Sequence, residues 1–458
     1  MEGLEVREVQ LSRILENKDG RFDTDFWIKE PILNPQLTYR RIGECLKVSQ
    51  YGISIEMNEE GIGQPIYRMN EIHNMLCDFS VSKFAQVTNS EILKFKLNNR
   101  DVLFNRTNSF EWVGRTGIYY KQPNRDFIFA SYLVRFVPDE NIIIPEYLTA
   151  YLNSKYGIWD LKRRARQSIN QTNINPEEVK EILIPILPIR FQLEIKSNFD
   201  KARDNFIESE RVYQTAQNLL LEHLGLKDFN PPAQAVNVKS FADSFGTSGR
   251  LDAEFYQEKY DVLVQKLKAQ EYDELKNLVS VKKSIEPGSS AYDEQGLPFI
   301  RVSDYDKFQI SSPAKYLSEA YCQEYCETLK NLQPKKGTIL FSKDGTVGIA
   351  HLLSEDLSGI TSGAILHLKV KDKRVLPEYL TLVLNSLAVQ WQAERDVGGS
   401  IIQHWRIEEI KEVVIPIISM EIQTQIADLI KQSNYLRIKS KGLLEKAKKA
   451  VELAIKKD

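Results

Sequence analysis

The sequence has few of the residues that build disulfide frameworks and metal sites. Its 458 residues include only four cysteines and five histidines. Cys322 and Cys326 lie four residues apart, which suits one face of a helix, but no neighbouring Cys or His completes a tetrahedral zinc site. The histidines are scattered along the chain. We therefore predict no disulfide framework and no metal site, and we interpret the cysteine pair as ordinary helix packing.

Long apolar runs are also missing. No stretch is long enough to span a membrane, and the N-terminus, Met1-Glu2-Gly3, lacks the basic-then-apolar pattern of a secretory signal. These features predict a cytoplasmic protein with no membrane partner.

Catalytic and nucleotide-binding motifs are absent as well. There is no Gly-x-x-x-x-Gly-Lys loop and no Gly-x-Gly-x-x-Gly fingerprint. Asn230-Pro231-Pro232 begins like the Asn-Pro-Pro-aromatic motif of amino-methyltransferases, but Ala233 replaces the aromatic residue and the segment is a polar linker. Residues 245–249 make a poor cofactor loop, because no helix-opening turn after a strand is evident. We predict no catalytic residue and no cofactor bound by this chain.

Charge of one sign is not in excess, since the net charge is -2 and the pI is about 6.3. Proteins that bind nucleic acid are usually basic overall. The charges are nevertheless segregated into two basic clusters, at residues 155–166 and from Lys439 onward. Each cluster could bind phosphate or could be the solvated face of a helix.

The most informative feature that is present is an internal repeat. Residues 20–27 (GRFDTDFW) match residues 249–256 (GRLDAEFY), at an offset of 229. Pro-Glu-Tyr-Leu-Thr at 145–149 recurs at 377–381, and Leu-Asn-Ser at 152–154 recurs at 384–386. Ile-Pro-Ile at 184–186 recurs at 415–417, after which Gln192 falls on Gln423. Nearly constant offsets over half the chain indicate a duplicated domain.

Each half predicts the same series of elements. Apolar, β-rich segments such as 65–68 and 298–301, or 101–104 and 338–341, predict strands, and the Pro-Glu segments open helices. Each half ends in a long helix whose apolar and small residues alternate spacings of four and three, as in a coiled-coil seam. The first seam is Ile195, Phe199, Ala202, Phe206, Ser209, Tyr213, Ala216 and Leu220. The second is Leu429, Ser433, Leu436, Ser440, Leu443, Ala447, Ala450 and Ala454. Pairing of the two helices is favoured over packing of each on a globular core, which usually needs a wider stripe.

These elements predict a mixed α/β (α+β) fold with two duplicated recognition domains and two long antiparallel coiled-coil helices. The predicted bounds are 1–190 for the first domain, 191–226 for the central helix, 227–248 for a linker, 249–420 for the second domain and 421–458 for the C-terminal helix.

Polar loops follow corresponding strands in the two halves. Arg and Lys suit guanine edges, Asn and Gln suit adenine edges, and Ser, Thr and backbone groups suit phosphates. The framework matches between the halves while these polar residues differ, as expected if one scaffold reads two DNA sequences. Ordinary turn chemistry is the alternative for any single loop. The candidate DNA-binding residues are Arg68, Asn105, Arg106, Thr107, Asn108, Ser168, Asn170, Gln171, Arg301, Ser342, Lys343, Thr346, Ser400, Gln403, His404 and Trp405.

The sequence as a whole resembles the specificity subunits of type I restriction-modification systems. The motifs that carry the resemblance are the two Gly-Arg openings, the Pro-Glu-Tyr-Leu helices, the Ile-Pro-Ile segments and Ile-Leu-Phe-Ser-Lys-Asp-Gly-Thr-Val-Gly at 339–348. The first half departs from the last motif, since Asn105-Arg106-Thr107-Asn108 stands where the second half has Ser342-Lys343-Asp344-Gly345.

The resemblance implies a non-catalytic subunit in which each domain reads one half of a split double-stranded DNA sequence. It also implies two methyltransferase subunits docked on the helices, which would bind S-adenosylmethionine and methylate adenine, and a restriction subunit that uses ATP and Mg²⁺. Two other classes stay open. One is a self-contained methyltransferase or nuclease, which would bind S-adenosylmethionine or cut DNA by itself. The other is a duplicated protein-binding scaffold, which would show no salt-dependent DNA binding.

Overall fold

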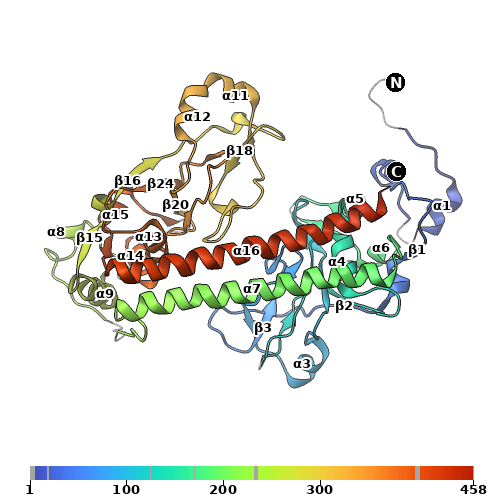
Figure 1. The fold of residues 1–458 in the computed structure, drawn as a ribbon, viewed down its shortest axis with the longest axis horizontal. Helices are drawn as coiled ribbons and strands as arrows, with labels where there is room; N and C mark the ends of the chain where they lie inside the picture. Colours follow the sequence, from blue (N-terminus) through green and yellow to red (C-terminus); the bar gives the residue numbers. More distant parts are fainter. Residues whose placement is uncertain are drawn as a thin grey trace. The chain divides into compact units, whose positions relative to one another are not determined.

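The computed structural model of the chain describes residues 6–17, 20–123, 125–169, 171–231, 236–397 and 403–456 (Figure 1). The chain forms two compact units. Unit 1 consists of Met1–Phe206 and Arg437–Asp458, and unit 2 consists of Ile207–Leu436. The boundary therefore passes through the two longest helices, α7 (Ile189–His223) and α16 (Met420–Ile455).

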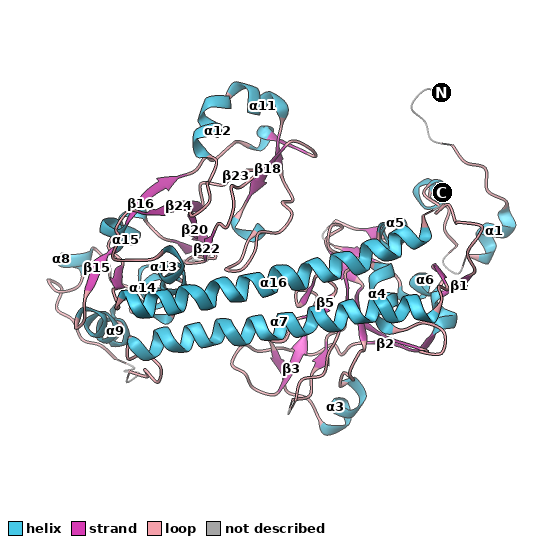
Figure 2. Ribbon diagram, in the orientation of Figure 1, coloured by secondary structure: helices cyan, strands magenta, loops and turns pink. Residues whose placement is uncertain are grey.

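Unit 1 is built around a six-stranded sheet of order β2-β11-β7-β9-β5-β4, in which every pairing is antiparallel except β5 with β9. Strands are magenta in Figure 2, which labels β2 and β5 of this sheet. Three smaller sheets accompany it: β10-β3-β6, β12-β13-β8 and β1-β14. Its other elements are α1 (Leu11–Glu16), α2 (Thr24–Ile28), β1 (Tyr39–Arg41), η1 (Ile42–Cys45), β2 (Leu46–Tyr51), β3 (Gln64–Tyr67), β4 (Ile72–His73), β5 (Leu76–Cys77), β6 (Phe84–Ala85), α3 (Asn89–Phe95), β7 (Val102–Asn105), β8 (Thr107–Asn108), β9 (Thr116–Ile118), β10 (Ile128–Phe129), β11 (Leu133–Pro138), α4 (Pro145–Leu152), α5 (Lys155–Arg164), β12 (Arg166–Gln167), β13 (Thr172–Asn173), α6 (Pro176–Lys180) and β14 (Leu183–Pro185).

Unit 2 has a four-stranded antiparallel sheet of order β16-β24-β20-β22, a second sheet of order β17-β19-β18-β23, and the pairs β15-β26 and β21-β25. Its other elements are α8 (Phe245–Ser248), η2 (Glu254–Tyr256), α9 (Glu258–Lys268), β15 (Tyr272–Glu274), α10 (Leu275–Leu278), β16 (Val279–Lys283), η3 (Ser289–Ala291), β17 (Tyr292–Asp293), β18 (Leu297–Ile300), η4 (Val302–Asp304), β19 (Tyr316–Leu317), α11 (Glu319–Glu324), α12 (Cys326–Leu332), β20 (Ile339–Ser342), β21 (Asp344–Gly345), β22 (Ala350–Leu352), β23 (Ile360–Thr361), β24 (Ile365–Val370), α13 (Pro377–Leu384), α14 (Leu387–Val397), β25 (Gln403–His404), α15 (Ile407–Lys411) and β26 (Val414–Pro416).

The two units repeat one topology, which confirms the predicted mixed α/β fold with duplicated domains. The strands β2-β11-β7-β9 of unit 1 correspond in order and direction to β16-β24-β20-β22 of unit 2. The parallel pair β3 and β10 corresponds to β18 and β23, and the antiparallel pair β1 and β14 corresponds to β15 and β26. The units differ in that unit 1 extends its sheet with β5 and β4, whereas unit 2 adds α9 and has α11 and α12 where unit 1 has α3.

The repeated Pro-Glu-Tyr-Leu segments form α4 and α13, each with Pro at its first position. Their N-cap residues, Ile144 and Leu376, have no side chain that can accept a hydrogen bond. The cap comes instead from the repeated glutamines, because Ile144 N–H donates to Gln192 Oε1 and Leu376 N–H donates to Gln423 Oε1, both at 2.9 Å. These two glutamines, at the start of the long helices, therefore tie each long helix to its own domain.

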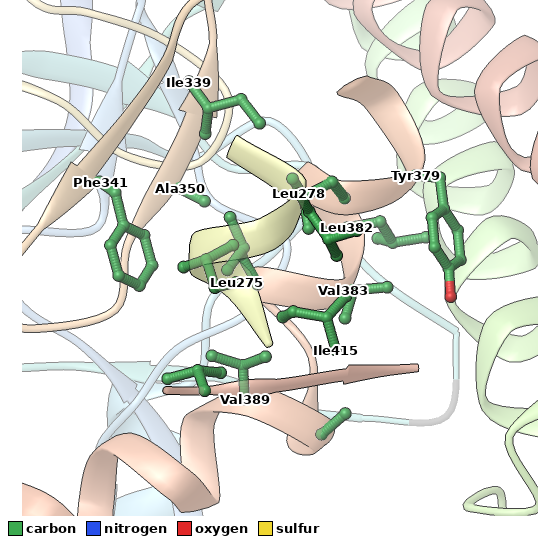
Figure 3. Close-up of a cluster of buried hydrophobic side chains, with 14 of the residues drawn as sticks. Leu275, Leu278, Ile339, Phe341, Ala350, Tyr379, Leu382, Val383, Val389 and Ile415 are labelled. Carbon is green, nitrogen blue, oxygen red and sulfur yellow. The ribbon is translucent and has the colours of Figure 1, made fainter. Parts of the chain in front are cut away.

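The largest cluster of buried hydrophobic side chains in unit 2 joins its four-stranded sheet to α10, α13 and α14 (Figure 3). Leu275 and Leu278 of α10 lie among Phe341 of β20, Tyr379 of α13 and Val389 of α14. Removing such a side chain from water stabilises the fold by about 1.5–3 kcal/mol. A corresponding cluster in unit 1 joins β7 and β11 to α4 and to the long helices.

The long helices pack against each other in both units. In unit 1, Ser440 Oγ donates to the carbonyl of Ala202 at 2.7 Å, and in unit 2, Ser433 Oγ donates to the carbonyl of Ser209 at 2.9 Å. Seven residues forward along α7 correspond to seven residues backward along α16, so the segments pair antiparallel, as predicted. Helix α7 ends at His223, and Gly225 just beyond it has a φ of 65°, the left-handed conformation typical of the residues after a helix C-terminus.

The predicted seam residues of α7 are buried with one exception, whereas the buried stripe of α16 is wider than the predicted seam. All its α7 positions are buried except Phe206, which is half-buried. In α16 only Ser433, Ser440 and Ala447 of the predicted line are buried, and the fully buried apolar residues lie one position further on: Ile430, Leu444, Val451 and Ile455. The stripe is wide because α16 contacts both α7 and the domain cores, which is the alternative that the sequence had left open.

Candidate nucleic-acid interface

In unit 1 the two predicted polar loops are brought together by a short antiparallel ribbon. Strand β8 pairs with β13, and β13 pairs with β12. Thr107 Oγ1 donates to Asn173 Oδ1 at 2.6 Å, and Ile174 N–H donates to the carbonyl of Arg106 at 2.9 Å. A turn closed by Ser168 N–H and the carbonyl of Gln171 joins β12 to β13. We call residues 106–108 and 166–173 the first loop pair.

Unit 2 repeats this arrangement with other residues. Strand β21 pairs with β25, so that Asp344 faces His404 and Gly345 faces Gln403. Trp405 N–H donates to the carbonyl of Lys343 at 2.8 Å, which matches the bond between Ile174 and Arg106 in unit 1. We call residues 343–346 and 403–404 the second loop pair. The sequence predicted the two loops of each half, whereas their pairing is visible only in the structure.

Three of the predicted DNA-binding side chains, Asn105, Ser342 and Trp405, are completely buried. Trp405 packs on Phe341, and its Nε1–H donates to Asp396. Asn105 Oδ1 accepts from Thr107 N–H, and Ser342 Oγ accepts from Ile349 N–H. These side chains support the loops from below instead of facing solvent. Trp405 directly follows β25, and its side chain is buried whereas Gln403 and His404 of β25 are both exposed.

Two further candidates, Thr107 and Lys343, are nearly buried, with exposed fractions of 6% and 5%. Lys343 forms an ion pair with Asp344, whose other carboxylate oxygen contacts Nδ1 of His404. In the second loop pair, the Asp344 carboxylate therefore lies between the buried ammonium of Lys343 and the exposed imidazole of His404.

The remaining candidates in the loop pairs reach the surface. Ser168, Gln171, Thr346, Gln403 and His404 are exposed, while Arg106 and Asn108 are half-buried. The Arg106 guanidinium lies over the ring of Tyr51, 5.1 Å from its centroid, which holds a planar donor group in a defined direction. Asn170 and Ser400 lie outside the described residues.

Arg68 and Arg301 occupy equivalent positions away from the loop pairs. Each backbone N–H donates to a carboxylate three residues later, Glu71 or Asp304, and each guanidinium contacts the same carboxylate. Both side chains are half-buried. The repetition of this geometry favours a structural turn over a base contact at these two positions.

The basic cluster at residues 155–166 is largely internal, which neither interpretation of its sequence had anticipated. Arg163 and Arg164 are buried and both contact Asp160, while Arg163 also donates to the carbonyl of Phe26. Lys162 donates to three carbonyls of residues 110–113, and burial lowers the pKa of Lys162 to about 8. By contrast, Lys439, Lys441, Lys446 and Lys449 of the C-terminal cluster lie on the exposed face of α16, and Lys457 lies outside the described residues.

Sequence reasoning missed Phe110, Glu111 and Trp112, which follow β8 directly. The signal was a difference in length. Eight positions separate Asn105 from Val113, whereas five separate the equivalent Ser342 from Val347. It also missed the contact between Tyr51 and Arg106. No sequence pattern indicates this contact, because the two residues lie far apart in the chain.

The described residues contain no group of three or more His, Cys, Asp or Glu placed to hold a metal ion. Among the same residues, no helix has the length and apolar character needed to cross a membrane. The geometry therefore presents two equivalent surface ribbons, each built on one framework and each carrying a different polar set.

Comparison with known proteins agrees with this geometry. Residues 270–449 match the family described as type I restriction modification DNA specificity domain. A protein of Methanocaldococcus jannaschii, described as the proposed specificity subunit of the type I restriction enzyme MjaX, is 24% identical over 427 residues, which cover 90% of this chain and 91% of that protein. Residues 270–449 thus resemble a type I specificity domain, and most of the chain is similar to a specificity subunit of a type I restriction enzyme.

Two further likenesses were found for this chain. The specificity subunit of the type I restriction enzyme EcoKI from Escherichia coli is 24% identical over 213 residues, covering 46% of this chain and 42% of that protein. The crystal structure of the type I restriction-modification S subunit from M. genitalium covers 94% of this chain and 99% of that one, with 12% identity and a TM-score of 0.41.

Proposed function

We propose that this specificity subunit recognises a DNA sequence in two parts and reads one part with each loop pair. The observation that carries the proposal is the repeated ribbon of the two units. The antiparallel pairing of β8 with β13 recurs as that of β21 with β25, while the outward side chains differ between Arg106, Asn108 and Gln171 in one unit and Thr346, Gln403 and His404 in the other. A common frame with different donors and acceptors is what reading two unlike sequences requires.

The domain roles follow from this proposal. Residues 1–190 and 249–420 would be the two target-recognition domains, and residues 191–226 and 421–458 the spacer helices, joined by a linker at 227–248. The continuous helices α7 and α16 support this division, because each begins within two residues of the proposed boundary.

As a specificity subunit, the chain acts in a complex with other restriction-modification subunits. We propose two methyltransferase subunits that bind S-adenosylmethionine and methylate adenine, and a restriction subunit that uses ATP and Mg²⁺, with the complex acting on cytoplasmic DNA. The net charge of -2 supports a need for partners, because contacts to phosphate dominate DNA affinity and this chain has no excess of positive charge.

The test is to map methylated adenines in a host that carries this chain and its methyltransferase partner. The native chain should direct methylation to a two-part sequence. Gln171→Ala should relax the first part only and Gln403→Ala the second part only, each by about tenfold, because a lost bidentate base contact costs about 1–3 kcal/mol. The control is Gln214→Ala, an exposed glutamine on α7, which should leave both parts unchanged. Uniform loss of methylation at all sites by both loop variants would instead mark contacts to phosphate.

A further inference from the structure

The loop that follows β8 differs from its counterpart in unit 2 by an insertion that carries two aromatic residues. Residues 109–113, which we call the aromatic loop, contain Phe110, Glu111 and Trp112, whereas Thr346 alone lies between Gly345 and Val347. Because β8 belongs to the first loop pair, this insertion adjoins the surface proposed to read the first half-site.

The aromatic loop is held in one conformation from both sides. Inside the loop, the carbonyl of Ser109 accepts from the N–H groups of Trp112 and Val113, and the Val113 side chain is buried. The Arg115 guanidinium lies 3.3 Å from the centroid of the Trp112 ring. A rigid loop loses little conformational entropy when it binds a partner.

Lys162 of α5 fastens the tip of the loop. Its ammonium donates to the carbonyls of Phe110, Glu111 at 3.1 Å and Val113 at 3.0 Å, and it lies 4.9 Å from the centroid of the Phe110 ring. The lysine is therefore committed to the loop rather than offered to solvent.

Despite this support, the Phe110 ring is 43% exposed. The loop therefore places one apolar ring, available for contact, beside the polar ribbon. The neighbouring Glu111 is also exposed. A carboxylate repels phosphate but can accept from the amino groups of bases, so this tip suits the floor of a DNA groove better than the DNA backbone.

We propose that Phe110 is a specificity-determining residue that packs against the C5-methyl group of a thymine in the major groove of the first half-site. The major groove is where this methyl group is presented, and phenylalanine is one of the side chains that contact it. Lys162 is a positioning residue that aims the ring. The second domain lacks this element, so the second half-site is read without it. This inference rests on the proposed two-part DNA recognition.

The test compares thymine with uracil, which differs only by lacking the methyl group. The complex of the full chain with its methyltransferase partner is titrated with duplexes in which each thymine of the first half-site is replaced by uracil in turn. At one position, uracil should weaken binding of the native complex about fourfold, since about 0.8 kcal/mol is lost per buried methyl-sized group. The Phe110→Ala complex should bind the thymine and uracil duplexes equally at that position.

Matched variants keep this test decisive. Phe22→Ala removes an exposed phenylalanine of the same unit outside the loop and should retain the fourfold difference. Phe110→Leu should retain part of it, and Lys162→Met, which cannot donate to the carbonyls, should reduce it while the second half-site is still recognised. An undiminished difference in Phe110→Ala, or a native complex that senses no uracil in the first half-site, overturns the inference. A native complex with no two-part preference at all would overturn the proposed function instead.

Discussion

At the residue scale, the arginines of the repeated Gly-Arg openings form hydrogen bonds within their own domains. Arg21 and Arg250 of the Gly-Arg openings each bind the carboxylate two residues later and reach a backbone carbonyl at the end of a helix, that of Arg164 at 3.2 Å or of Asp396 at 2.5 Å. Each guanidinium also lies over a phenylalanine ring, at 4.8 Å and 4.4 Å. The motif was recognisable because it recurs. In the structure, Arg21 connects the start of the first domain to α5, and Arg250 connects the start of the second domain to α14.

Arg21→Ala and Arg250→Ala should therefore destabilise the protein without touching its loops. Each change removes hydrogen bonds to charged groups from a mostly buried guanidinium, so the free energy of unfolding should fall by about 1.5–3 kcal/mol. Urea unfolding followed by circular dichroism measures the effect. Arg211→Ala, which breaks an exposed pair with Glu208, is the control and should leave the unfolding midpoint unchanged.

His367 connects the two sheets of unit 2 by a 2.7 Å hydrogen bond between its Nε2 and Thr361 Oγ1. Burial lowers the pKa of His367 to about 4, so the folded state holds this ring neutral at pH values where an unfolded chain would protonate it. The stabilisation is fully present above the unfolded pKa of about 6.5 and is lost as the pH falls toward 4.

The free energy of unfolding should accordingly decrease by about 3 kcal/mol between pH 6.5 and pH 4 because of this residue. Carboxylates titrate in part of the same range, so the measurement is the difference between the native protein and His367→Gln across denaturant titrations at each pH. The two profiles of unfolding free energy should differ in slope between pH 4 and pH 6.5. Parallel profiles would show that the buried ring does not couple to stability.

At the scale of elements, secondary structure followed from local patterns, whereas helix capping did not. The Pro-Glu-Tyr-Leu helices were predicted correctly from Pro at the first turn. Their N-caps come from Gln192 and Gln423, more than forty residues further along the chain, with exposed fractions of 1% and 0%. The sequence repeat aligned Gln192 with Gln423 but did not show which groups these glutamines bind.

Gln192→Ala and Gln423→Ala should each lower the free energy of unfolding by about 1–3 kcal/mol, because a buried N–H loses its acceptor and buried carbonyls lose their donor. The duplication predicts equal effects in the two units. The measurement is the urea midpoint, with Gln432→Ala on the exposed face of α16 as the control. A large effect for only one glutamine would show that the repeated hydrogen bonds contribute unequally to the free energy of unfolding.

At the scale of the whole molecule, both units are built on parts of the same two helices. The unit boundary cuts α7 after Phe206 and α16 after Leu436. At about 1.5 Å per residue, each helix is roughly 50 Å long, which exceeds one turn of DNA, about 34 Å.

Seven residues inserted at each of these two cuts should lengthen the gap in the recognised DNA. A heptad keeps the helix seam in register and adds roughly 10 Å, or about three base pairs. The bases read in each half-site should stay the same, as measured by mapping methylated adenines. A single insertion in α7 shifts Ala202 and Ser209 relative to their partners on α16 and should abolish activity. An active double variant with the native gap would show that something other than these helices sets the spacing.

The sequence by itself determined the duplication, the order of elements, the long helices and the family, because these depend on motifs and periodicities within short stretches of chain. It also located the polar loops of each half. Only the tertiary structure decided which of their side chains face outward. Trp405, Asn105 and Ser342 are buried because of residues that lie on other strands and helices, such as Phe341, Asp396 and Ile349. The same is true of α16, whose buried stripe widened since two different surfaces pack against it. Burial depends on contacts between distant segments, and a local pattern of polar and apolar residues does not contain them.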